Sequence, residues 1–229
     1  MENKEAIVIS LGGSVVVPDV PNSDFIIRFR ELILKWVKDY NKRFFIIIGG
    51  GKVCREYQKA LIEINNDNPE DLDWIGIYTT QLNAQLVRLS FKGYTPDDIV
   101  TDPSIASSLH NDVVIGAGWK PGCSTDTDAV LIANEINAKK IINLSNIDYV
   151  YDSDPKVNPN AKKIENLSWK EYRSIISSEW TPGMNSPFDP VASRKAEELG
   201  IEVAFMVGTD LDSLEKYLKG EEFVGSTIR

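Results

Sequence analysis

The chain has 229 residues, of which 42% are hydrophobic and 26% are charged, a composition that is typical of a globular protein and excludes a disordered tail. Its formal net charge of −9 argues against nucleic acid as a partner, because a phosphate backbone requires a dense surface of Lys and Arg. Without a long apolar run or a signal-peptide pattern, the sequence predicts one cytoplasmic domain with no membrane partner.

Short apolar, β-branched runs are typical of buried strands, and segments with helical spacing alternate with them. This alternation predicts an α/β fold with a mainly parallel sheet covered by helices on both faces, whose ligands gather where the strands end. Two polar stretches rich in turn formers predict long loops. The expected strands are residues 6–11, 44–48, 113–117, 141–144 and 203–207, the expected helical stripes are 25–40, 53–64 and 129–136, and the expected loops are 65–73 and 151–163.

Cysteine and histidine are scarce in this chain. Cys54 and Cys123 make neither a disulfide framework nor a metal motif, so we expect them to be small, partly buried side chains. With His110 as the one imidazole, a multi-histidine metal site and a Ser-His-Asp triad are disfavoured. The chemistry must therefore use carboxylates, Lys, Arg, hydroxyl groups and the backbone.

Glycines directly follow the first two expected strands. Gly12 and Gly13 let the backbone approach a ligand closely, although a tight turn between a strand and a helix also favours glycine. Residues 49–51 are three consecutive glycines ahead of a helix that carries Lys52 and Arg55. Because the amino end of a helix attracts anions and Arg binds phosphate with paired donors, phosphate binding is favoured here over a flexible turn.

A third glycine-rich loop, residues 116–125, joins the third strand to the next helix. Ser124 and Thr125 are good helix caps, but capping does not explain several glycines and Lys120 in the same loop. The loop fits neither G-x-x-x-x-G-K-[ST] nor G-x-G-x-x-G, which disfavours a P-loop enzyme and a dinucleotide oxidoreductase. A fourth segment, residues 144–155, carries carboxylates that suit Mg²⁺, but an ordinary Asp-rich surface loop is favoured on local grounds.

Taken in chain order, the motifs GGS, GGGKxxR, GxxPGxSTDxDA, SNIDYVYxxDP and SPFDPVASRKAEELGI resemble the amino acid kinase family, and within it the prokaryotic hexameric branch that acts on UMP. The resemblance implies a three-layer αβα sandwich forming one domain over residues 1–229, with UMP held by about residues 1–125 and ATP by about residues 126–229. The implied reaction is ATP + UMP giving ADP + UDP, in pyrimidine nucleotide biosynthesis. Mg²⁺ would be bound mainly through phosphates, and the implied assembly is a homo-oligomer, a hexamer.

The same resemblance implies site residues by their position in the motifs. Arg55 falls where the family binds the UMP phosphate, Asp73 where it holds the ribose hydroxyls, and Asp189 where a late aspartate orients lysine or metal-bound groups. The implied catalytic group is Gly12, Gly13, Lys52, Arg55 and Asp189. The implied UMP-binding group is Gly50, Arg55, Asp73, Gly118, Trp119, Lys120, Pro121, Gly122, Cys123, Ser124 and Thr125. The implied ATP-binding group is Ser10, Leu11, Gly12, Gly13, Gly51, Ser145, Tyr151 and Asp154.

One departure from the family pattern concerns charge at the reacting phosphate. Many members carry a lysine where this chain has Ser10, and the hypothesis is that Lys52 or Lys120 replaces it. Two alternatives therefore remain beside the UMP reaction. One is a kinase of the same fold for another acceptor, such as an isoprenoid, carbamoyl or acyl phosphate, although His110 lies outside every motif. The other is a non-catalytic protein that binds nucleotides or oxyanions.

Overall fold

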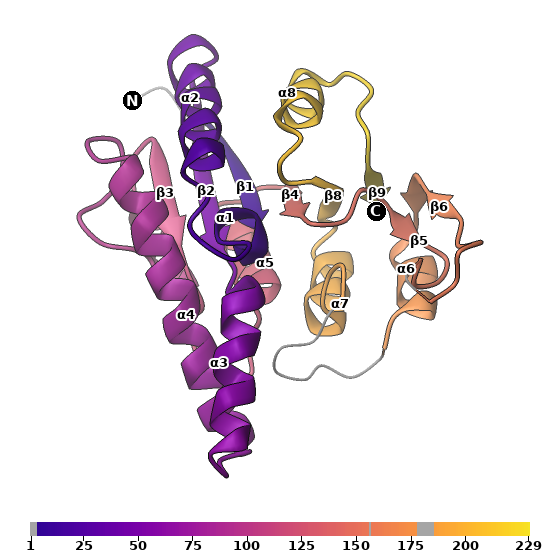
Figure 1. Ribbon diagram of the computed structural model, residues 1–229. Helices are drawn as coiled ribbons and strands as arrows, with labels where there is room; N and C mark the ends of the chain where they lie inside the picture. Colours follow the sequence, from indigo (N-terminus) through magenta and orange to yellow (C-terminus); the bar gives the residue numbers. More distant parts are fainter. Residues whose placement is uncertain (1–3, 156, 178–185) are drawn as a thin grey trace.

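The computed structural model describes residues 4–155, 157–177 and 186–229 (Figure 1). Its main sheet has the strand order β3-β2-β1-β4-β8-β9-β7, with every neighbouring pair parallel except β8 and β9. A separate antiparallel pair is formed by β5 and β6. The strands are β1 Glu5–Leu11, β2 Lys42–Ile48, β3 Val113–Gly116, β4 Lys140–Ser145, β5 Val150–Tyr151, β6 Lys163–Ile164, β7 Asn166–Leu167, β8 Glu202–Val207 and β9 Ser226–Ile228.

Helices cover both faces of this sheet and bury alternate strand residues against it. On one face the core includes side chains of α2, α4 and α8, and on the other it includes side chains of α5, α6 and α7. This arrangement confirms the predicted αβα sandwich around a mainly parallel sheet. The helices are α1 Gly13–Val16, α2 Ser23–Asp39, α3 Gly51–Glu63, α4 Pro69–Ser90, the 3-10 helix η1 Pro103–Ser108, α5 Thr125–Glu135, α6 Trp169–Ile175, α7 Pro190–Glu198 and α8 Leu211–Lys219.

The five expected strands are present, and each begins and ends within two residues of its predicted bounds, the largest difference being the start of β2 at Lys42. They were predictable because a strand buried on both faces is a continuous apolar run. The short strands β7 and β9 carry no such run and were not predicted. None of the helices in the described ranges is long and apolar enough to cross a membrane.

Helix α2 matches the predicted stripe because its apolar side chains face the core. Phe25, Phe29, Ile33 and Trp36 are all buried, and the side chain of the cap residue Asn22 accepts a hydrogen bond from the amide of Phe25. The stripe therefore serves packing within the chain.

The second predicted stripe, in α3, is not a core-facing stripe. Tyr57 and Ile64 are 54% and 72% exposed. Helices α3 and α4 run side by side and extend beyond the edge of the sheet (Figure 1), so α3 has only a narrow face to bury. Gln58 is its buried residue and donates a hydrogen bond to the carbonyl of Leu72 in α4.

The prediction of a loop over residues 65–73 was wrong in its second half. Helix α4 begins at Pro69, and the side chain of Asn68 accepts hydrogen bonds from the amides of Glu70 and Asp71. These turn-forming residues are therefore the cap and first turn of a helix, a use that the same residue types also favour. As a result, Asp73 lies inside α4 and does not precede it. The other predicted loop, residues 151–163, is a loop over its described part, except that its first and last residues, Tyr151 and Lys163, belong to β5 and β6.

Strand register brings the sequence motifs to one edge of the sheet. Leu11, the last residue of β1, is paired with Ile48 of β2 on one side and with Leu144 of β4 on the other. Because these strands are parallel, the segments that follow them leave the sheet together. The turns at Gly12, Gly49 and Ser145 are therefore neighbours.

Candidate active site

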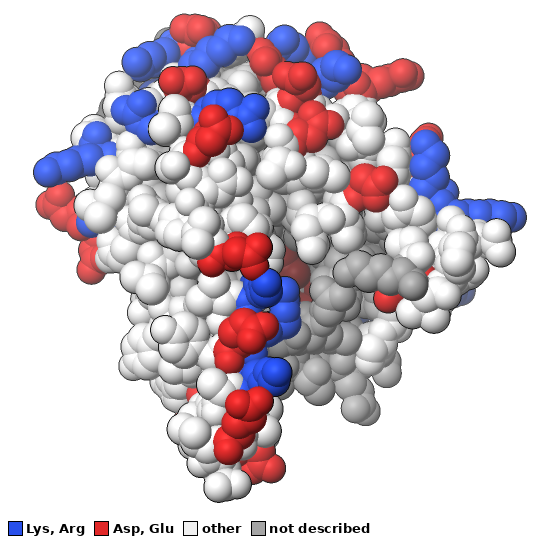
Figure 2. Space-filling view, viewed as in Figure 1, with Lys and Arg blue, Asp and Glu red and all other residues white. Residues whose placement is uncertain are grey.

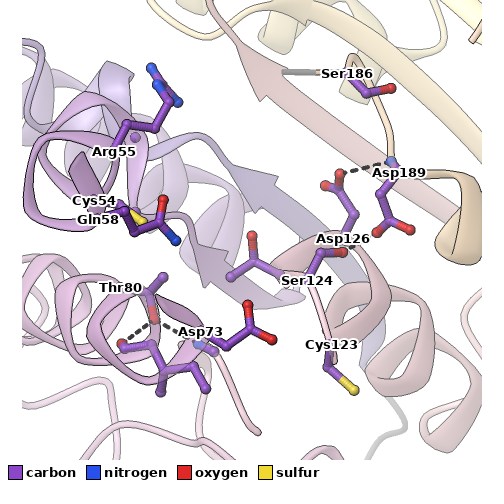
Figure 3. A pocket seen from close by; sticks show the side chains of 16 residues that line it. Cys54, Arg55, Gln58, Asp73, Thr80, Cys123, Ser124, Asp126, Ser186 and Asp189 are labelled. Carbon is purple, nitrogen blue, oxygen red and sulfur yellow. Dashed lines mark hydrogen bonds between the residues drawn. The ribbon is translucent and has the colours of Figure 1, made fainter. Parts of the chain in front are cut away.

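The first cavity lies at the carboxyl edge of the sheet, between the start of α3, helix α4 and the loop that leads into α5 (Figure 3). In Figure 2 the surface is hollowed beside the charged side chains of α3. The volume is about 190 Å³, below the ~300–1,000 Å³ of most small-molecule sites, so a nucleotide would extend beyond it. The described lining residues are Gly50, Gly51, Cys54, Arg55, Gln58, Asp73, Gly76, Ile77, Thr80, Gly118, Cys123, Ser124, Thr125, Asp126, Ser186 and Asp189.

Two glycine turns beside this cavity lie backbone to backbone. A Cβ atom added to Gly13 would stand 2.3 Å from the carbonyl oxygen of Gly49, and one added to Gly51 would stand 2.3 Å from the amide nitrogen of Ser14. Gly51 also has a φ of +66°, which side chains rarely adopt. Gly13 and Gly51 are thus required by the contact between the turns, whether or not they touch a ligand.

The amino end of α3 presents an arginine to the cavity. Arg55 is exposed, lines the cavity, and its side chain forms no ion pair or hydrogen bond within the described ranges. Its donors are therefore available to an anion, and the first-turn amides of α3 favour an anion at the same place. Lys52 points elsewhere, because its ammonium group is bonded to Asp19 and does not line the cavity. That hydrogen bond raises the pKa of Lys52.

Three hydrogen bonds fasten the loop between β3 and α5. The amide of Gly118 donates to Thr80 Oγ1 at 2.8 Å, and the amide of Gly122 donates to Asp73 Oδ2 at 2.8 Å. The amide of Trp119 donates to the carboxylate of Asp128, as described below. Burial raises the pKa of Asp73, although the bond from the Gly122 amide opposes this effect. Asp73 therefore both lines the cavity and positions the loop.

The amino end of α5 holds a cluster of carboxylates. Asp189 accepts hydrogen bonds from the hydroxyl groups of Ser124 and Thr127, and also caps α7. Asp126 accepts from Ser10 Oγ at 3.0 Å and from Asn143 Nδ2 at 3.2 Å. It also accepts from the amide of Asp189 at 3.3 Å, as Figure 3 shows. Burial, assisted by the negative charge of Asp189, raises the pKa of Asp126 to about 7. Asp126 therefore connects Ser10, which stands where a lysine was expected, with the lining of the first cavity.

Asp128 is a second carboxylate with unusual surroundings. It is 1% exposed, and its Oδ2 accepts the amide of Trp119 at 3.2 Å, whereas its Oδ1 has no hydrogen-bond partner. Burial raises the pKa of Asp128 to about 8, with the negative charges of Asp189 and Asp126 adding to the effect. Asp128 is therefore mostly protonated at neutral pH.

A second cavity, of about 370 Å³, lies beyond the end of β4. It is formed mainly by the segment from Ser145 to Pro155, together with residues 175–177 and 186–187. The hydroxyl of Tyr151 donates to the carboxylate of Asp148 at 3.1 Å. Ser186 lines both cavities, so the two hollows are adjacent.

The turn after β1 lies between the two hollows without lining either. The amide of Gly12 donates to the carbonyl of Leu144 at 2.8 Å, and a Cβ added to Gly12 would stand 3.5 Å from the Cα of Ser145. Ser10 and Leu11 are buried in β1, and Ser10 faces Asp126. This stretch thus connects the carboxylate cluster to the wall of the second cavity.

The cavities divide most of the residues implied by the motifs into two groups. The first cavity brings together Gly50, Gly51, Arg55, Asp73, Gly118, Cys123, Ser124, Thr125 and Asp189. The second brings together Ser145, Tyr151 and Asp154. The linings of both exclude Ser10, Leu11, Gly12, Gly13, Lys52, Trp119, Lys120, Pro121 and Gly122. Lys120 instead stacks its ammonium group on the ring of Trp119, 3.8 Å from the centroid.

Several lining residues were missed by sequence reasoning. Asp126 stands in the first turn of a helix, where the helix dipole ordinarily explains an acidic residue. Its position in the sequence therefore did not indicate a functional role. Gln58 and Thr80 face the cavity from α3 and α4, and nothing in the local sequence sets them apart from their neighbours. Cys54 also lines the cavity, and burial raises the pKa of its thiol to about 11, which makes it a poor nucleophile.

Comparisons with a family profile and with known relatives agree on one family. Residues 5–206 match the profile described as the amino acid kinase family. The uridylate kinase of Thermoplasma acidophilum is 34% identical over 228 residues, covering 98% of this chain and 96% of that protein. The uridylate kinase of Thermococcus sibiricus is 33% identical over 218 residues, covering 94% and 96%.

Solved structures agree with these sequence matches. The crystal structure of uridylate kinase from Archaeoglobus fulgidus superposes with a TM-score of 0.82 at 33% identity, covering 97% of this chain and 99% of that chain. The UMP kinase of Bacillus anthracis superposes with a TM-score of 0.79 at 23% identity, covering 98% and 96%, and supports the fold alone.

Proposed function

The chain belongs to the amino acid kinase family, and from that premise we propose that it transfers the terminal phosphoryl group of ATP to UMP, giving ADP and UDP. The resemblance inferred from the motifs is thereby confirmed at the level of the family. The named relatives that match nearly the whole chain are uridylate kinases, and no feature of the site favours another acceptor or a non-catalytic role.

The observation that carries the proposal is the arginine facing the first cavity. Arg55 has free donors beside the amino end of α3, and this arrangement suits the phosphate of a nucleoside monophosphate. On this assignment Gly50 and Arg55 bind the UMP phosphate, Asp73 faces the ribose, and the loop 118–125 faces the base. The N-terminal part of the single domain, about residues 1–125, would supply most of this acceptor site.

ATP is assigned to the second cavity and the turn after β1. Ser145, Tyr151 and Asp154 would line the adenosine site, and the reacting phosphate would lie between the Gly12–Gly13 turn, Gly51 and the first cavity. Phosphoryl transfer depends on positioning and on stabilising negative charge, which backbone amides and Arg55 supply. Asp189 would contribute by holding the start of α5 through Ser124 and Thr127.

Lys52 and Lys120 are the proposed replacements for the lysine absent at Ser10. Each now has another partner, Asp19 for Lys52 and the ring of Trp119 for Lys120, and each would have to leave it. Both side chains are exposed and long, so the movement costs little. Unchanged turnover after substitution of both lysines by Ala would eliminate this part of the proposal.

We propose that Mg²⁺ enters with the phosphates of ATP. The described residues contain no group of three or more His, Cys, Asp or Glu side chains that could hold a metal ion. This suits Mg²⁺, which commonly keeps its waters and binds substrate phosphates in place of a protein cage. When bound, the ion would neutralise charge on the transferring phosphoryl group, and no protein ligand is assigned to it.

The proposal is tested by measuring ADP release with ATP, Mg²⁺ and a panel of UMP, CMP, AMP and GMP. We expect UMP to give by far the highest kcat/KM. Turnover with a different phosphorylated acceptor, and none with UMP, would favour a sister kinase. Tight ATP binding without turnover for any acceptor would favour a non-catalytic protein.

We further propose a homo-oligomer, and specifically a hexamer. Its support in this chain is an apolar stripe along the outer side of α4, at positions spaced mostly four residues apart so that they share a face. The stripe consists of Trp74, Tyr78, Leu82, Leu86 and Leu89, which are 38–68% exposed. Light scattering of the wild type should give six copies. The variant Leu82→Glu should give fewer, whereas Glu63→Gln on the exposed end of α3 should not.

The product UDP is a precursor of other pyrimidine nucleotides, so we propose a role in cytoplasmic pyrimidine nucleotide biosynthesis. Depletion of the protein should lower cellular UDP and UTP and raise UMP. Unchanged pools would contradict this role without affecting the assignment of the reaction.

A further inference from the structure

The largest of the three hollows described in this structure lies at the opposite end of the sheet from the candidate active site. Its volume is about 1020 Å³, compared with about 190 Å³ and 370 Å³ for the two active-site cavities. The first residues of β1, β2, β4 and β8 line it, which places it at the amino edge of the parallel strands. A seven-residue strand spans about 20 Å, so this third cavity is separate from the catalytic edge.

The lining of the third cavity is basic, although the protein as a whole is acidic. Among the described residues it contains seven Lys and Arg side chains and three Glu side chains, in a chain of net charge −9. The seven are Lys4, Lys42, Arg43, Lys139, Lys140, Lys219 and Arg229. A positive hollow in a negative protein is where an anionic ligand would concentrate.

Four of these cations are already paired with carboxylates. Lys42 is bonded to Glu5, Lys140 lies 3.6 Å from Glu202, Lys4 is bonded to Asp112, and Lys219 lies 3.1 Å from Glu215. These pairs cancel most of their own charge. Arg43, Lys139 and Arg229 are the lining cations outside these pairs, and Glu221 is the lining carboxylate outside them.

Arg43 and Lys139 keep their positive charge. Arg43 Nη2 donates to the carbonyl of Leu109 at 2.6 Å, and Lys139 Nζ donates to the carbonyl of Leu199 at 3.0 Å. A carbonyl accepts a hydrogen bond without neutralising the cation. Arg43 Nε is buried with no hydrogen-bond partner among the described residues, and burial lowers the pKa of this guanidinium, although the negative charge of Asp112 opposes that effect.

Strand register sets these two residues on either side of one small residue. Arg43 is paired with Ala6 of β1, and Lys139 stands two positions before Ile141, which is paired with Val8. Lys139 therefore reaches the level of Ala6 from the other side. Adjacent strands are about 4.8 Å apart, so the two backbones are separated by about 10 Å across a residue with almost no side chain. Both cations therefore stand at the amino edge of the sheet, one strand to either side of β1.

We propose that the third cavity binds a polyphosphate chain, free or as part of a nucleotide, through Arg43 and Lys139. The chain carries several negative charges in a line, matching two separated cations. Tyr217 and Phe223, whose rings meet edge to face with centroids 5.0 Å apart, line the same hollow and offer an apolar surface to a base. This inference does not depend on the proposed kinase reaction.

The test is calorimetric titration of the full chain with inorganic triphosphate, without substrates. Arg55→Ala removes the anion site of the first cavity, and we expect this variant still to bind triphosphate. In the same background, Lys139→Glu should weaken binding about tenfold or more, the effect of losing one charge-assisted hydrogen bond. Lys92→Glu makes the same charge change on an exposed residue outside the cavity and should alter affinity less than twofold.

The carboxyl end of α5 also lies near these cations and would be stabilised by them without any ligand. Thermal unfolding separates the two effects, since a purely structural role would lower the midpoint of Lys139→Glu and leave triphosphate affinity unchanged. That result, or loss of all triphosphate binding in Arg55→Ala alone, would overturn the proposal. Lys139→Ala serves in the same way if the charge reversal prevents folding.

A second arm distinguishes the two sources of the phosphate chain. In the Arg55→Ala background, the affinities for inorganic triphosphate and for a nucleoside triphosphate are each measured with Lys139 and with Lys139→Glu. The part of each affinity that the Lys139 substitution removes is then compared between the two probes. A gain of tenfold or more with the nucleoside would identify a nucleotide, and equal affinities would identify the phosphate chain alone. If Lys139→Glu changes the affinity for neither triphosphate, the proposed site is contradicted.

Discussion

The two active-site cavities are built in different ways. The first draws its lining from α3, α4, the loop before α5 and the segment at Asp189, so its residues come together only through the tertiary fold. The second is formed mainly by one continuous segment from Ser145 to Pro155. We infer that a substitution in the first cavity disturbs contacts across several elements, whereas one in the second stays local. The following predictions test this difference, from the largest effect to the smallest.

The largest expected effect is the loss of the arginine that faces the first cavity. Arg55→Ala should lower kcat/KM for UMP roughly 100-fold, because charge-stabilising donors at the reacting end of a substrate contribute this much. KM for ATP should change little if the cavities are separate sites. Lys59→Ala, four residues further along the same exposed helix, is the matched control and should retain wild-type rates. Equal losses for both variants would refute the assignment of the acceptor phosphate.

The next effect concerns Asp73, which holds the loop between β3 and α5. Asp73→Ala removes the hydrogen bond to the Gly122 amide and should raise KM for UMP about tenfold, with a smaller change in kcat. Asp71→Ala, two residues earlier in α4, removes a carboxylate that accepts a hydrogen bond from Asn66, outside the cavity, and should leave KM near the wild-type value. A change in KM for ATP alone would show that Asp73 belongs to the donor site.

A smaller, local effect is expected in the second cavity. Tyr151→Phe removes the hydroxyl that donates to Asp148 and should raise KM for ATP about fivefold, the result of losing one hydrogen bond. KM for UMP should stay the same. Tyr57→Phe on the exposed side of α3 is the control and should change neither constant. If Tyr151→Phe alters only KM for UMP, the two cavities have been assigned the wrong way round.

The smallest expected effect is a pH dependence of the protein's stability caused by the buried carboxylate of Asp128. The pKa of Asp128 is about 8 in the folded protein and about 3.9 in an unfolded chain. Between these values the folded state holds the extra proton, so stability falls as pH rises from about 4 to 8. Asp128→Asn removes this penalty and should raise the unfolding midpoint by roughly 2–6 °C at pH 8.5, and by about a quarter as much at pH 5.

Calorimetry of the wild type and Asp128→Asn at the two pH values makes this measurement. Asp71→Asn, an exposed carboxylate, should give no difference between the same pH values. If the Asp128→Asn midpoint rises equally at pH 5 and pH 8.5, burial of a titrating carboxylate is not the cause.

The sequence predicted the parts of the fold whose signal is local. The strand from Phe44 to Ile48 is a continuous apolar run, and Gly49 to Gly51 follow it directly, so both the strand and the edge of the sheet carrying the motifs could be anticipated. The start of α4 could not, because Asn68, Pro69 and Asp71 suit a loop and a helix cap equally well. Here only the packing of α4 against α3 decides between the two.

The candidate site was anticipated less completely than the fold, for a related reason. Arg55 and Asp73 were named through their motifs, but the bond from the Gly122 amide to Asp73 joins positions 49 residues apart and exists only in the folded chain. Asp126, in α5, was missed because its partners Ser10 and Asn143 lie in β1 and β4 and meet it only in the folded chain. A carboxylate whose pKa is set by such neighbours has no local sequence pattern.

The most direct test of the central claim follows the phosphoryl group itself. The chain is incubated with UMP, Mg²⁺ and ATP labelled in its terminal phosphate, and the products are separated by chromatography, for the wild type and for Arg55→Ala. The account predicts that the label appears in UDP with the wild type and is reduced roughly 100-fold in Arg55→Ala. Label found only in inorganic phosphate, or UDP formed equally fast by Arg55→Ala, would contradict it.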